Sequence, residues 1–250
     1  MTKIAFIPST FLPHVGGAET QTHNVANNLQ QKKIEVDVYV LNKNLIKNAN
    51  YKIIKLNKYI INFIFILKYY FNINFDFLIK SYFNKIQNKK KYDLWHFHSV
   101  NYKTLIYINV LHTLNQKIIV TLQGADIQID KKINYGYRLD AKYEKFIKLS
   151  FKKVHLFHAI SENIKMELIK LGVPKNKILI IPNCTPLDKI KKIKKIKVKK
   201  KITLLTIGRY AIKKKGFDLV EKISKNLNKI AKYEWIIIGR HTTELLKKKY

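Results

Sequence analysis

Glycines and basic residues mark the places where this chain could bind an anion. Gly16 and Gly17 precede a segment of helical period, so the loop there can bring backbone N–H groups up to a phosphate, with the helix dipole adding to the attraction. Arg209 follows a short apolar run, and Lys215 lies six residues later. Arginine can hold a diphosphate with its planar fork and lysine as a point charge. A tight turn at the glycines and a solvated loop at the basic residues are the alternative interpretations.

His96 and His98 stand two positions apart at the end of a predicted strand, which places both rings on the same side. Such a pair could ligate a metal ion. No cysteine or third histidine lies nearby in the sequence at zinc-site spacing, so no metal is expected. We expect instead that this strand end lines a binding cleft, with one or both imidazoles contacting ligand hydroxyls. A purely structural role is the alternative.

Short β-branched runs that alternate with segments of helical period must position these side chains. The runs that read as strands are Lys3–Ile7, Glu35–Leu41, Lys52–Leu56, Asp93–Phe97, Lys117–Leu122, Val154–Ile160 and Lys177–Ile181. The chain has only 8 glycines, against roughly 17 expected from average usage, and several directly follow apolar runs. Glycines just past the carboxyl ends of strands predict an α/β fold with a parallel sheet whose loops approach a ligand closely.

Two helices can be predicted in detail. The first follows Gly17, and its buried face consists of Ala18, Thr22, Val25, Ala26 and Leu29. This helix completes a βαβ unit. The second has Ser161 as N-cap, Gly172 as its C-terminal stop and Pro174 just beyond, with a buried stripe of Ile164, Leu168 and Leu171.

The composition limits the class of protein. Of 250 residues, 47% are apolar, which excludes a disordered chain and suits one large domain or up to two ordinary ones. The chain has 49 Lys and Arg against 16 Asp and Glu, a net charge of +33. That charge suits phosphate-rich partners, but adenine- and thymine-rich codons would also supply it, and both explanations stay open. The single Cys184 and the absence of a signal-peptide pattern indicate a cytoplasmic protein.

A basic segment divides the chain. Pro182 and Pro186 precede Lys189–Lys201, in which nine of thirteen residues are lysine. We predict an N-terminal domain at residues 1–183, a linker at 184–201 and a second domain at 202–250. The second domain begins with a strand at Ile202–Ile207, a helix near Phe217–Ile230 and a strand at Glu234–Ile238. Because two strands cannot bury both faces of a sheet, we expect this domain to be incomplete.

Six short motifs carry a family resemblance. In chain order they are Phe11–Glu19 (FLPHVGGAE), Asp93–Ser99 (DLWHFHS), Val120–Ile127 (VTLQGADI), Ile160–Glu162 (ISE), Ile181–Asn183 (IPN) and Ile207–Tyr210 (IGRY) continuing to Lys215–Phe217 (KGF). Together they resemble glycosyltransferase family 4. The resemblance implies a GT-B fold, in which two Rossmann-like domains enclose the active cleft.

The resemblance also implies retaining transfer of a sugar from a nucleotide-sugar to an acceptor held mainly by the first domain. Gly16, Gly17, Arg209 and Lys215 would then bind the donor diphosphate, whose negative charge grows as the glycosidic bond breaks. The strand end that carries the two histidines would line the acceptor cleft. No cofactor and no obligatory divalent cation are implied.

Gln123 departs from the commoner family pattern, which has His at this position near the reacting centre. Glutamine can hydrogen-bond to sugar hydroxyls, but it cannot serve as an acid or base. A retaining mechanism in which the leaving phosphate takes the acceptor proton would survive the change. Asp126 would orient the loop or the acceptor, or cap a helix. We assign Gln123 and Asp126 to the catalytic centre.

One apolar segment bears on membrane association. Tyr59–Phe71 is apolar except for Asn62 and Lys68, and its thirteen residues fall short of the roughly 20 needed for a helical span. We expect a buried helix of the first domain. Alternatively, the segment lies in the membrane interface beside a lipid-linked acceptor, and the linker lysines add attraction to anionic lipid.

The expected function is sugar transfer to a glycan or lipid-linked acceptor in surface polysaccharide or glycolipid synthesis. Relatives carry, beyond the Gly-Arg loop, a pair of glutamates that no segment here supplies. A catalytically inactive, truncated protein that binds an acceptor or an anionic surface is therefore an alternative. Nonspecific nucleic-acid binding is another, motivated by the charge and by 15 Tyr and 13 Phe residues, although no nucleic-acid-binding motif accompanies them.

Overall fold

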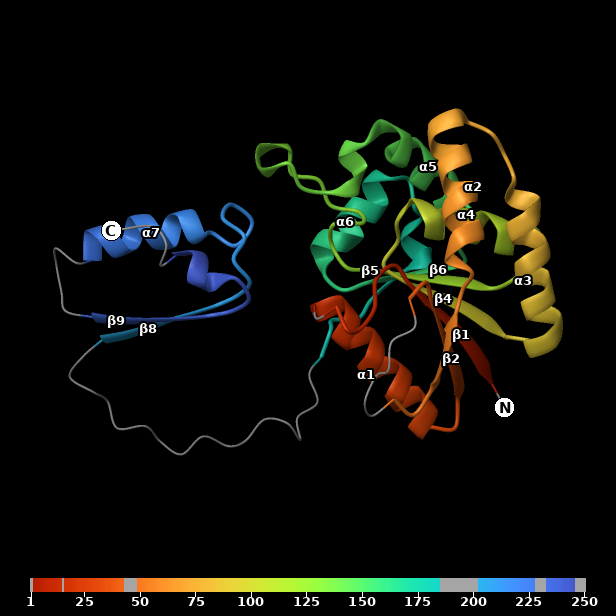
Figure 1. Cartoon of the computed structure of the whole chain (residues 1–250), viewed down its shortest axis with the longest axis horizontal. Coiled ribbons are helices and arrows are strands. Elements are labelled where there is room, and N and C mark those ends of the chain that lie inside the picture. The colour runs from red at the N-terminus through yellow and green to blue at the C-terminus, as the bar shows by residue number, and fades with distance from the viewer. Residues whose placement is uncertain (1, 15, 43–48, 185–201, 228–232, 246–250) are drawn as a thin grey trace. The chain divides into compact units, whose positions relative to one another are not determined.

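The computed structural model of the chain describes residues 2–14, 16–42, 49–184, 202–227 and 233–245 (Figure 1). The chain divides into two compact units, residues 1–185 and 186–250, and each is described by itself. Apart from Cys184, the predicted linker lies outside the described residues.

The first unit is built on a seven-stranded sheet in the order β3-β2-β1-β4-β5-β6-β7. Every neighbouring pair is parallel. The strands are β1 Lys3–Pro8, β2 Glu35–Val40, β3 Lys52–Lys55, β4 Leu94–His98, β5 Ile118–Leu122, β6 Leu156–Ala159 and β7 Ile178–Ile180. All seven predicted strands are present within two residues at each end. The strand order reverses between β1 and β4, where open α/β sheets form a crevice at their carboxyl edge.

Among the described residues of this unit, six helices cover the two faces of the sheet: α1 Gly17–Gln31, α2 Lys58–Phe71, α3 Asp76–Lys90, α4 Tyr102–Thr113, α5 Ala141–Phe151 and α6 Glu162–Lys170 (Figure 1). On one face, Phe6 and Val38 form a core with Ala26 of α1. On the other, Trp95 and Phe97 pack with residues of α2 to α5. A parallel sheet covered on both faces needs strands that are apolar on both sides, which explains the continuous apolar runs. Short 3₁₀ turns lie at Lys131–Ile133, Tyr137–Leu139 and Lys175–Lys177.

Both predicted helices are confirmed. In α1, Thr22 and Ala26 are buried, and Val25 and Leu29 pack against the same core. At the start of α6, the Ser161 hydroxyl accepts a hydrogen bond from the Ile164 N–H at 3.4 Å. The helix stops before Gly172, whose φ of +85° is a left-handed value that favours glycine.

The segment Tyr59–Phe71 forms α2, but the expectation that this helix is buried is wrong for one side of it. Only Ile61 and Ile64 are buried. Tyr59, Phe63, Ile66 and Tyr70 recur every three or four residues and are 44–75% exposed. The sheet lies on one side of α2 alone, so the other side remains at the surface, although its residues are equally apolar. No helix among the described residues is both long and apolar enough to cross a membrane.

The second unit contains a parallel pair of strands, β8 Ile202–Ile207 and β9 Tyr233–Ile238, joined through α7 Phe217–Leu227. A 3₁₀ turn, Thr242–Leu245, follows. The predicted end of the helix at Ile230 lies outside the described residues. Gly239 has φ +159°, and a Cβ there would overlap the carbonyl of Gly208, so the backbones after β8 and β9 meet at close range. The predicted strand-helix-strand pattern is therefore confirmed.

Candidate functional site

Three neighbouring strands of the first unit, β4, β5 and β6, carry polar side chains to the carboxyl edge of the sheet. Pairing places Pro8 of β1 opposite His98, His98 opposite Thr121, and Thr121 opposite His158 of β6. Since residues opposite each other in parallel strands share a face, the two histidines of β4 lie on one face with Thr121 and His158. The centroids of the His96 and His98 rings are 4.1 Å apart, as the two-residue spacing predicts.

A hydrogen-bond chain joins this edge across three strands. Nε2 of His158 lies 2.6 Å from the carbonyl oxygen of Ile181, which can only accept, so this nitrogen carries the proton. In the neutral form of the ring, Nδ1 of His158 then accepts from the Thr121 hydroxyl at 2.9 Å. The Thr121 oxygen in turn accepts from Nε2 of His96 at 2.8 Å. One carbonyl thereby fixes the tautomers of both histidines.

The two histidines of β4 are neutral at pH 7. Burial, and then the charge of His158, lowers the pKa of His96 to about 3. Burial, followed by His96 and His158, also lowers the pKa of His98 well below its ordinary value. His98 packs on Phe6, with ring centroids 4.3 Å apart, and neither of its ring nitrogens has a hydrogen-bond partner among the described residues. Within those residues, no group of three or more His, Cys, Asp or Glu side chains could hold a metal ion.

Asp126 stabilises the loop that follows β5 through hydrogen bonds to its backbone. Its buried carboxylate accepts backbone N–H bonds from Gly124 at 2.7 Å, from Gln123 at 3.1 Å and from Val100 at 3.4 Å. Burial raises the pKa of this carboxyl, and the hydrogen bonds oppose that shift. The carboxylate joins the loop after β4 to the loop after β5, which is the loop-orienting arrangement considered from the sequence.

Gln123 directly follows β5, and only the oxygen of its side-chain amide is hydrogen-bonded within the described residues. Its Oε1 accepts a hydrogen bond from Asn183 Nδ2 at 3.2 Å. Its Nε2 is buried and has no hydrogen-bond partner among the described residues. Because an unpaired buried N–H costs free energy comparable to a lost hydrogen bond, this atom is available to donate to an acceptor oxygen.

Gly16 and Gly17 begin α1, but an acidic side chain already occupies the space beside them. A Cβ on Gly16 would overlap the carboxylate of Glu19, whereas a Cβ on Gly17 would meet no atom within 4 Å. Glu19 is 6% exposed and accepts a hydrogen bond from the Thr10 hydroxyl at 2.6 Å. His14 Nδ1 lies 3.3 Å from the same carboxylate. The helix N-terminus is thus occupied by an anion of the chain itself.

The remaining predicted residues belong to the second unit. Arg209 and Lys215 are exposed on the loop between β8 and α7. Partial burial, and then the charge of Arg209, lowers the pKa of Lys214, so these two cations lie near each other. The carbonyl of Arg240 accepts a hydrogen bond from Tyr210 N–H at 2.8 Å, which adds a basic residue after β9 to the same strand ends.

The structure therefore brings His96, His98, Gln123 and Asp126 to one edge of the first unit, and Arg209 and Lys215 to one loop of the second. The sequence analysis missed Thr121, His158, Glu19 and Arg240. Thr121 and His158 lie within the last three residues of predicted strands, so strand register could have drawn attention to them. Glu19 stands in the first turn of a predicted helix, and Arg240 follows a predicted strand.

Solved structures identify the class of fold. The chain is similar to a glycosyltransferase from Rickettsia africae ESF-5 (16% identity, TM-score 0.56), covering 96% of this chain and 69% of that one. It is similar to the lipopolysaccharide outer core galactosyltransferase WaaB (17%, 0.61), covering 97% and 62%. It is also similar to Anabaena HepE in complex with UDP-glucose (11%, 0.56), covering 98% and 71%. These likenesses show a GT-B fold, as the sequence predicts.

The sequence itself identifies the family. The family model of Glycosyltransferase Family 4 matches residues 15–189, and the chain belongs to that family. A comparison with curated proteins finds no match. The chain spans about two thirds of the length of the solved structures described above.

Proposed function

We propose that this protein takes part in the transfer of a sugar, with retention, from a nucleotide-sugar to a glycan or lipid-linked acceptor in surface polysaccharide or glycolipid synthesis. Family membership supports sugar transfer. The names of two similar structures, a lipopolysaccharide galactosyltransferase and a complex with UDP-glucose, favour a nucleotide-sugar donor and a glycan acceptor. In this proposal the first unit holds the acceptor and the second binds the donor.

The observation that carries the proposal is a set of buried hydrogen-bonding atoms at one edge of the sheet that find no partner in the described part of the chain. These are Nε2 of Gln123 and both ring nitrogens of His98. A polyhydroxylated ligand supplies partners for such atoms, and its binding would relieve the cost of leaving them unpaired. The low pKa values of His96 and His98 keep the rings neutral, so they act as hydrogen-bonding groups rather than as acids.

Each residue then has a defined role. Gln123 donates to a sugar hydroxyl, and Asp126 holds the loop that presents it. Arg209 and Lys215 stabilise the charge that develops on the leaving diphosphate. Gln123 stands where the commoner family pattern has His, and glutamine cannot take up a proton. The leaving phosphate therefore takes the proton of the acceptor hydroxyl. No metal or cofactor is required for these roles.

Calorimetric titration of the full chain with UDP-glucose, UDP-galactose and GDP-mannose tests the proposal. We expect at least one of them to bind, and Arg209→Ala to weaken that binding about 10- to 100-fold, because hydrogen bonds to charged groups contribute about 1.5–3 kcal/mol. Lys213→Ala is the matched control, an exposed lysine on the same loop that should change binding less than about 2-fold. Absence of binding by all three nucleotide-sugars, or equal losses in both variants, would contradict the proposal.

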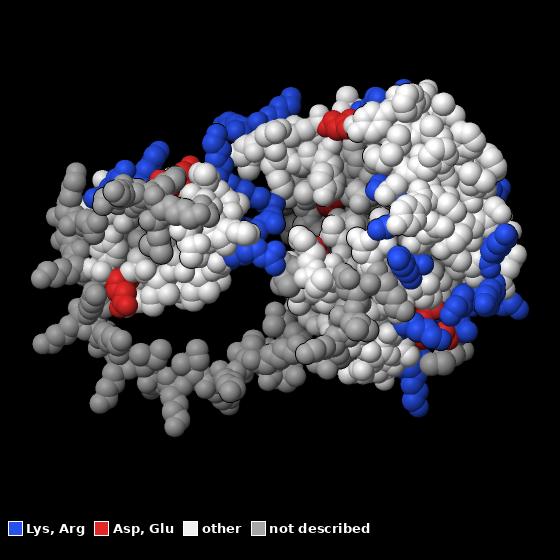
Figure 2. All heavy atoms as spheres, viewed as in Figure 1, with Lys and Arg blue, Asp and Glu red and all other residues white. Residues whose placement is uncertain are grey.

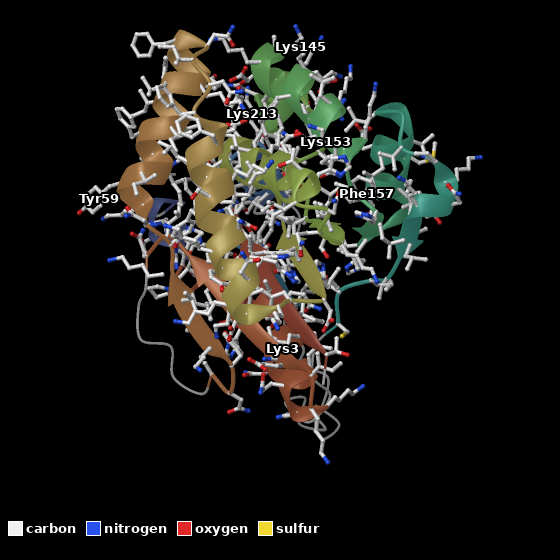
Figure 3. The ribbon with its side chains drawn as sticks, turned by 90° about the vertical axis from the view of Figure 1, so that its right-hand side faces the viewer. Lys3, Tyr59, Lys145, Lys153, Phe157 and Lys213 are labelled. Atoms are coloured by element: carbon white, nitrogen blue, oxygen red, sulfur yellow. The ribbon has the colours of Figure 1, made fainter. Side chains whose placement is uncertain are left out.

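Peripheral membrane association at the cytoplasmic face is a second proposal, and the exposed side of α2 supports it. Figure 2 shows a broad surface without charged side chains over this helix, and Tyr59 projects outward in Figure 3. The exposed rings of Tyr59, Phe63 and Tyr70 form an aromatic stripe along α2. Lys58 Nζ lies 5.2 Å from the centroid of the Tyr59 ring, so a cation lies beside this stripe. A helix with aromatic residues on its exposed side and lysines beside them is typical of elements that lie in the membrane interface. A chain without transfer activity would retain this property, as the alternative from the sequence expects.

A further inference from the structure

A pocket of about 550 Å³ lies beside the candidate site in the first unit. The second half of α2, the start of α4 and the loop that leads into α5 form its walls. The loop folds back on itself at Gly136, which has φ +109° and where a Cβ would overlap the carbonyl of Gln128. The volume is in the range of about 300–1,000 Å³ that is typical of small-molecule sites.

The pocket has aromatic walls whose rings are held by one another. Phe65 stacks on Tyr69 with ring centroids 5.4 Å apart, and Tyr69 meets the edge of Tyr102 at 5.0 Å. Tyr102 is backed by Phe146 in a stacked arrangement at 4.7 Å. The rings of Tyr137 and Tyr143 pack in a T-shaped arrangement with centroids 5.8 Å apart. Such mutual packing fixes the ring faces before a ligand arrives, which lowers the entropic cost of binding.

Polar groups stand at the edges of these rings. The Asp140 carboxylate accepts hydrogen bonds from the Tyr69 hydroxyl and from the backbone N–H groups of Lys142 at 2.8 Å and Tyr143 at 3.2 Å. Burial raises the pKa of Asp140, but these hydrogen bonds outweigh it and leave the pKa below its ordinary value, so the group is charged at pH 7. Tyr102 and Tyr137 also line the pocket, and their hydroxyls can donate to and accept from a ligand.

A residue that lines the pocket is hydrogen-bonded to the loop that carries the candidate catalytic residues Gln123 and Asp126. Tyr143 lines the pocket, and its buried hydroxyl donates to the carbonyl of Asp126 at 3.1 Å and lies 3.3 Å from that of Val100. The carboxylate of Asp126 in turn holds the backbone of Gln123. A ligand in the pocket would therefore lie next to the carboxyl edge of β4 and β5.

We propose that this pocket binds an uncharged sugar ring of the acceptor, stacked on the faces of Tyr102 and Tyr137 with its hydroxyls directed to Asp140. A pyranose has an apolar face of C–H groups and a polar rim, which is the pattern that the walls present. A phosphate would be repelled by the carboxylate of Asp140. An alkyl chain would leave the carboxylate and the phenol hydroxyls without ligand partners. The inference rests on the proposed function, of which it specifies the acceptor.

Saturation-transfer NMR of the full chain, without any nucleotide, tests the inference with methyl glycosides of glucose, galactose and mannose as probes. We expect saturation to reach the ring protons of at least one glycoside. Tyr137→Ala should weaken its binding about 3- to 10-fold through loss of a ring face. Tyr70→Ala, at the exposed rim of the pocket, should weaken it in the same direction, so the test does not depend on one variant folding. Tyr59→Ala is the control, because this tyrosine is 75% exposed on α2 outside the pocket.

Three results would overturn the inference. The first is that no glycoside receives saturation, and the second is that the pocket variants and the wild type give equal saturation of the glycoside. The third is that dodecanoate or inorganic phosphate displaces a bound glycoside and does so equally well in Tyr137→Ala. The readout is independent of the donor. If the protein binds a nucleotide-sugar but no glycoside, the pocket proposal is wrong and the proposed function stands. If it binds a glycoside but no nucleotide-sugar, the proposed function is wrong and the pocket proposal stands.

Discussion

The Thr121 hydroxyl donates a hydrogen bond to Nδ1 of His158 at 2.9 Å. Because the other nitrogen of His158 donates to the carbonyl of Ile181, the direction of this bond is fixed. Thr121 is then left to accept from His96, and a backbone carbonyl after β7 determines which nitrogen of His96 bears the proton. The protonation pattern of His96 on β4 is thus set by a carbonyl group after β7, through His158 of β6 and Thr121 of β5.

Thr121→Val should break this chain at its centre. The variant keeps the shape of the side chain but removes the hydroxyl, so one nitrogen on each of His96 and His158 loses its partner. We expect the free energy of unfolding to fall by about 2–3 kcal/mol, measured by urea denaturation. Nitrogen-15 NMR should show Nε2–H tautomers for both rings in the wild type. In the variant, His96 should show mixed tautomers, whereas His158 still donates to the Ile181 carbonyl and should keep its Nε2–H tautomer. Thr121→Ser, which retains the hydroxyl, should keep the wild-type tautomers; mixed tautomers there would refute the assignment.

Acidification should destabilise the protein through the histidines of β4. Their pKa values are lowered in the folded chain, that of His96 to about 3 from an ordinary value of 6.5. The unfolded chain therefore binds more protons in this window. The stabilisation is complete above pH 6.5 and is lost as the pH falls toward 3, at up to about 1.4 kcal/mol per pH unit for each group.

His98→Leu should reduce this loss. The substitution removes a buried ring whose nitrogens have no partner among the described residues, so stability at pH 7.5 should be equal or higher. Between pH 7.5 and 5.5, its stability should fall less than that of the wild type. His112→Gln changes an exposed histidine and should leave the wild-type slope. An unchanged slope in His98→Leu would show that His98 is not the group that titrates.

Gly16→Ala and Gly17→Ala should have opposite effects although the glycines are adjacent. A methyl group on Gly16 must displace the carboxylate of Glu19, which we expect to cost about 1–3 kcal/mol of stability. A methyl group on Gly17 meets open space at the first position of α1 and should be neutral or stabilise by up to about 1 kcal/mol. Thermal denaturation measures both. Equal losses would indicate that Glu19 does not occupy the space beside Gly16.

The aromatic stripe of α2 predicts binding to lipid. Replacing both Tyr59 and Phe63 with Ser should reduce partitioning onto vesicles of phosphatidylglycerol and phosphatidylcholine at least about 10-fold, since each ring would bury a large apolar area in the interface. Sedimentation with the vesicles measures it. Replacing Leu149 and Met166, which are 50% and 49% exposed on other helices, is the matched control. Equal effects of the two double variants would point to nonspecific adsorption.

Much of the fold could be predicted from local signals. All seven strands of the first unit were predicted, because each contains a short run of apolar, often β-branched residues, including the edge strand β3, which has no buried residue. The caps of α6 were predicted for the same reason, because the Ser161 hydroxyl and the φ of Gly172 act within one turn. Helix α4 was not predicted in detail. Its residues from Thr104 to Leu111 are all buried, so the sequence shows no alternation of apolar and polar faces.

The candidate site divides along the same line. The sequence by itself determined which residues stand at strand ends, including His98 and Gln123, because the positions of strands follow from local composition. Only the tertiary structure decided which atoms of these residues are engaged. The Thr121 hydrogen bond to His158 joins residues 37 positions apart through the register of β5 and β6, and the Asn183 hydrogen bond to Gln123 joins residues 60 positions apart. Such contacts are fixed by packing between distant segments, which no local pattern encodes.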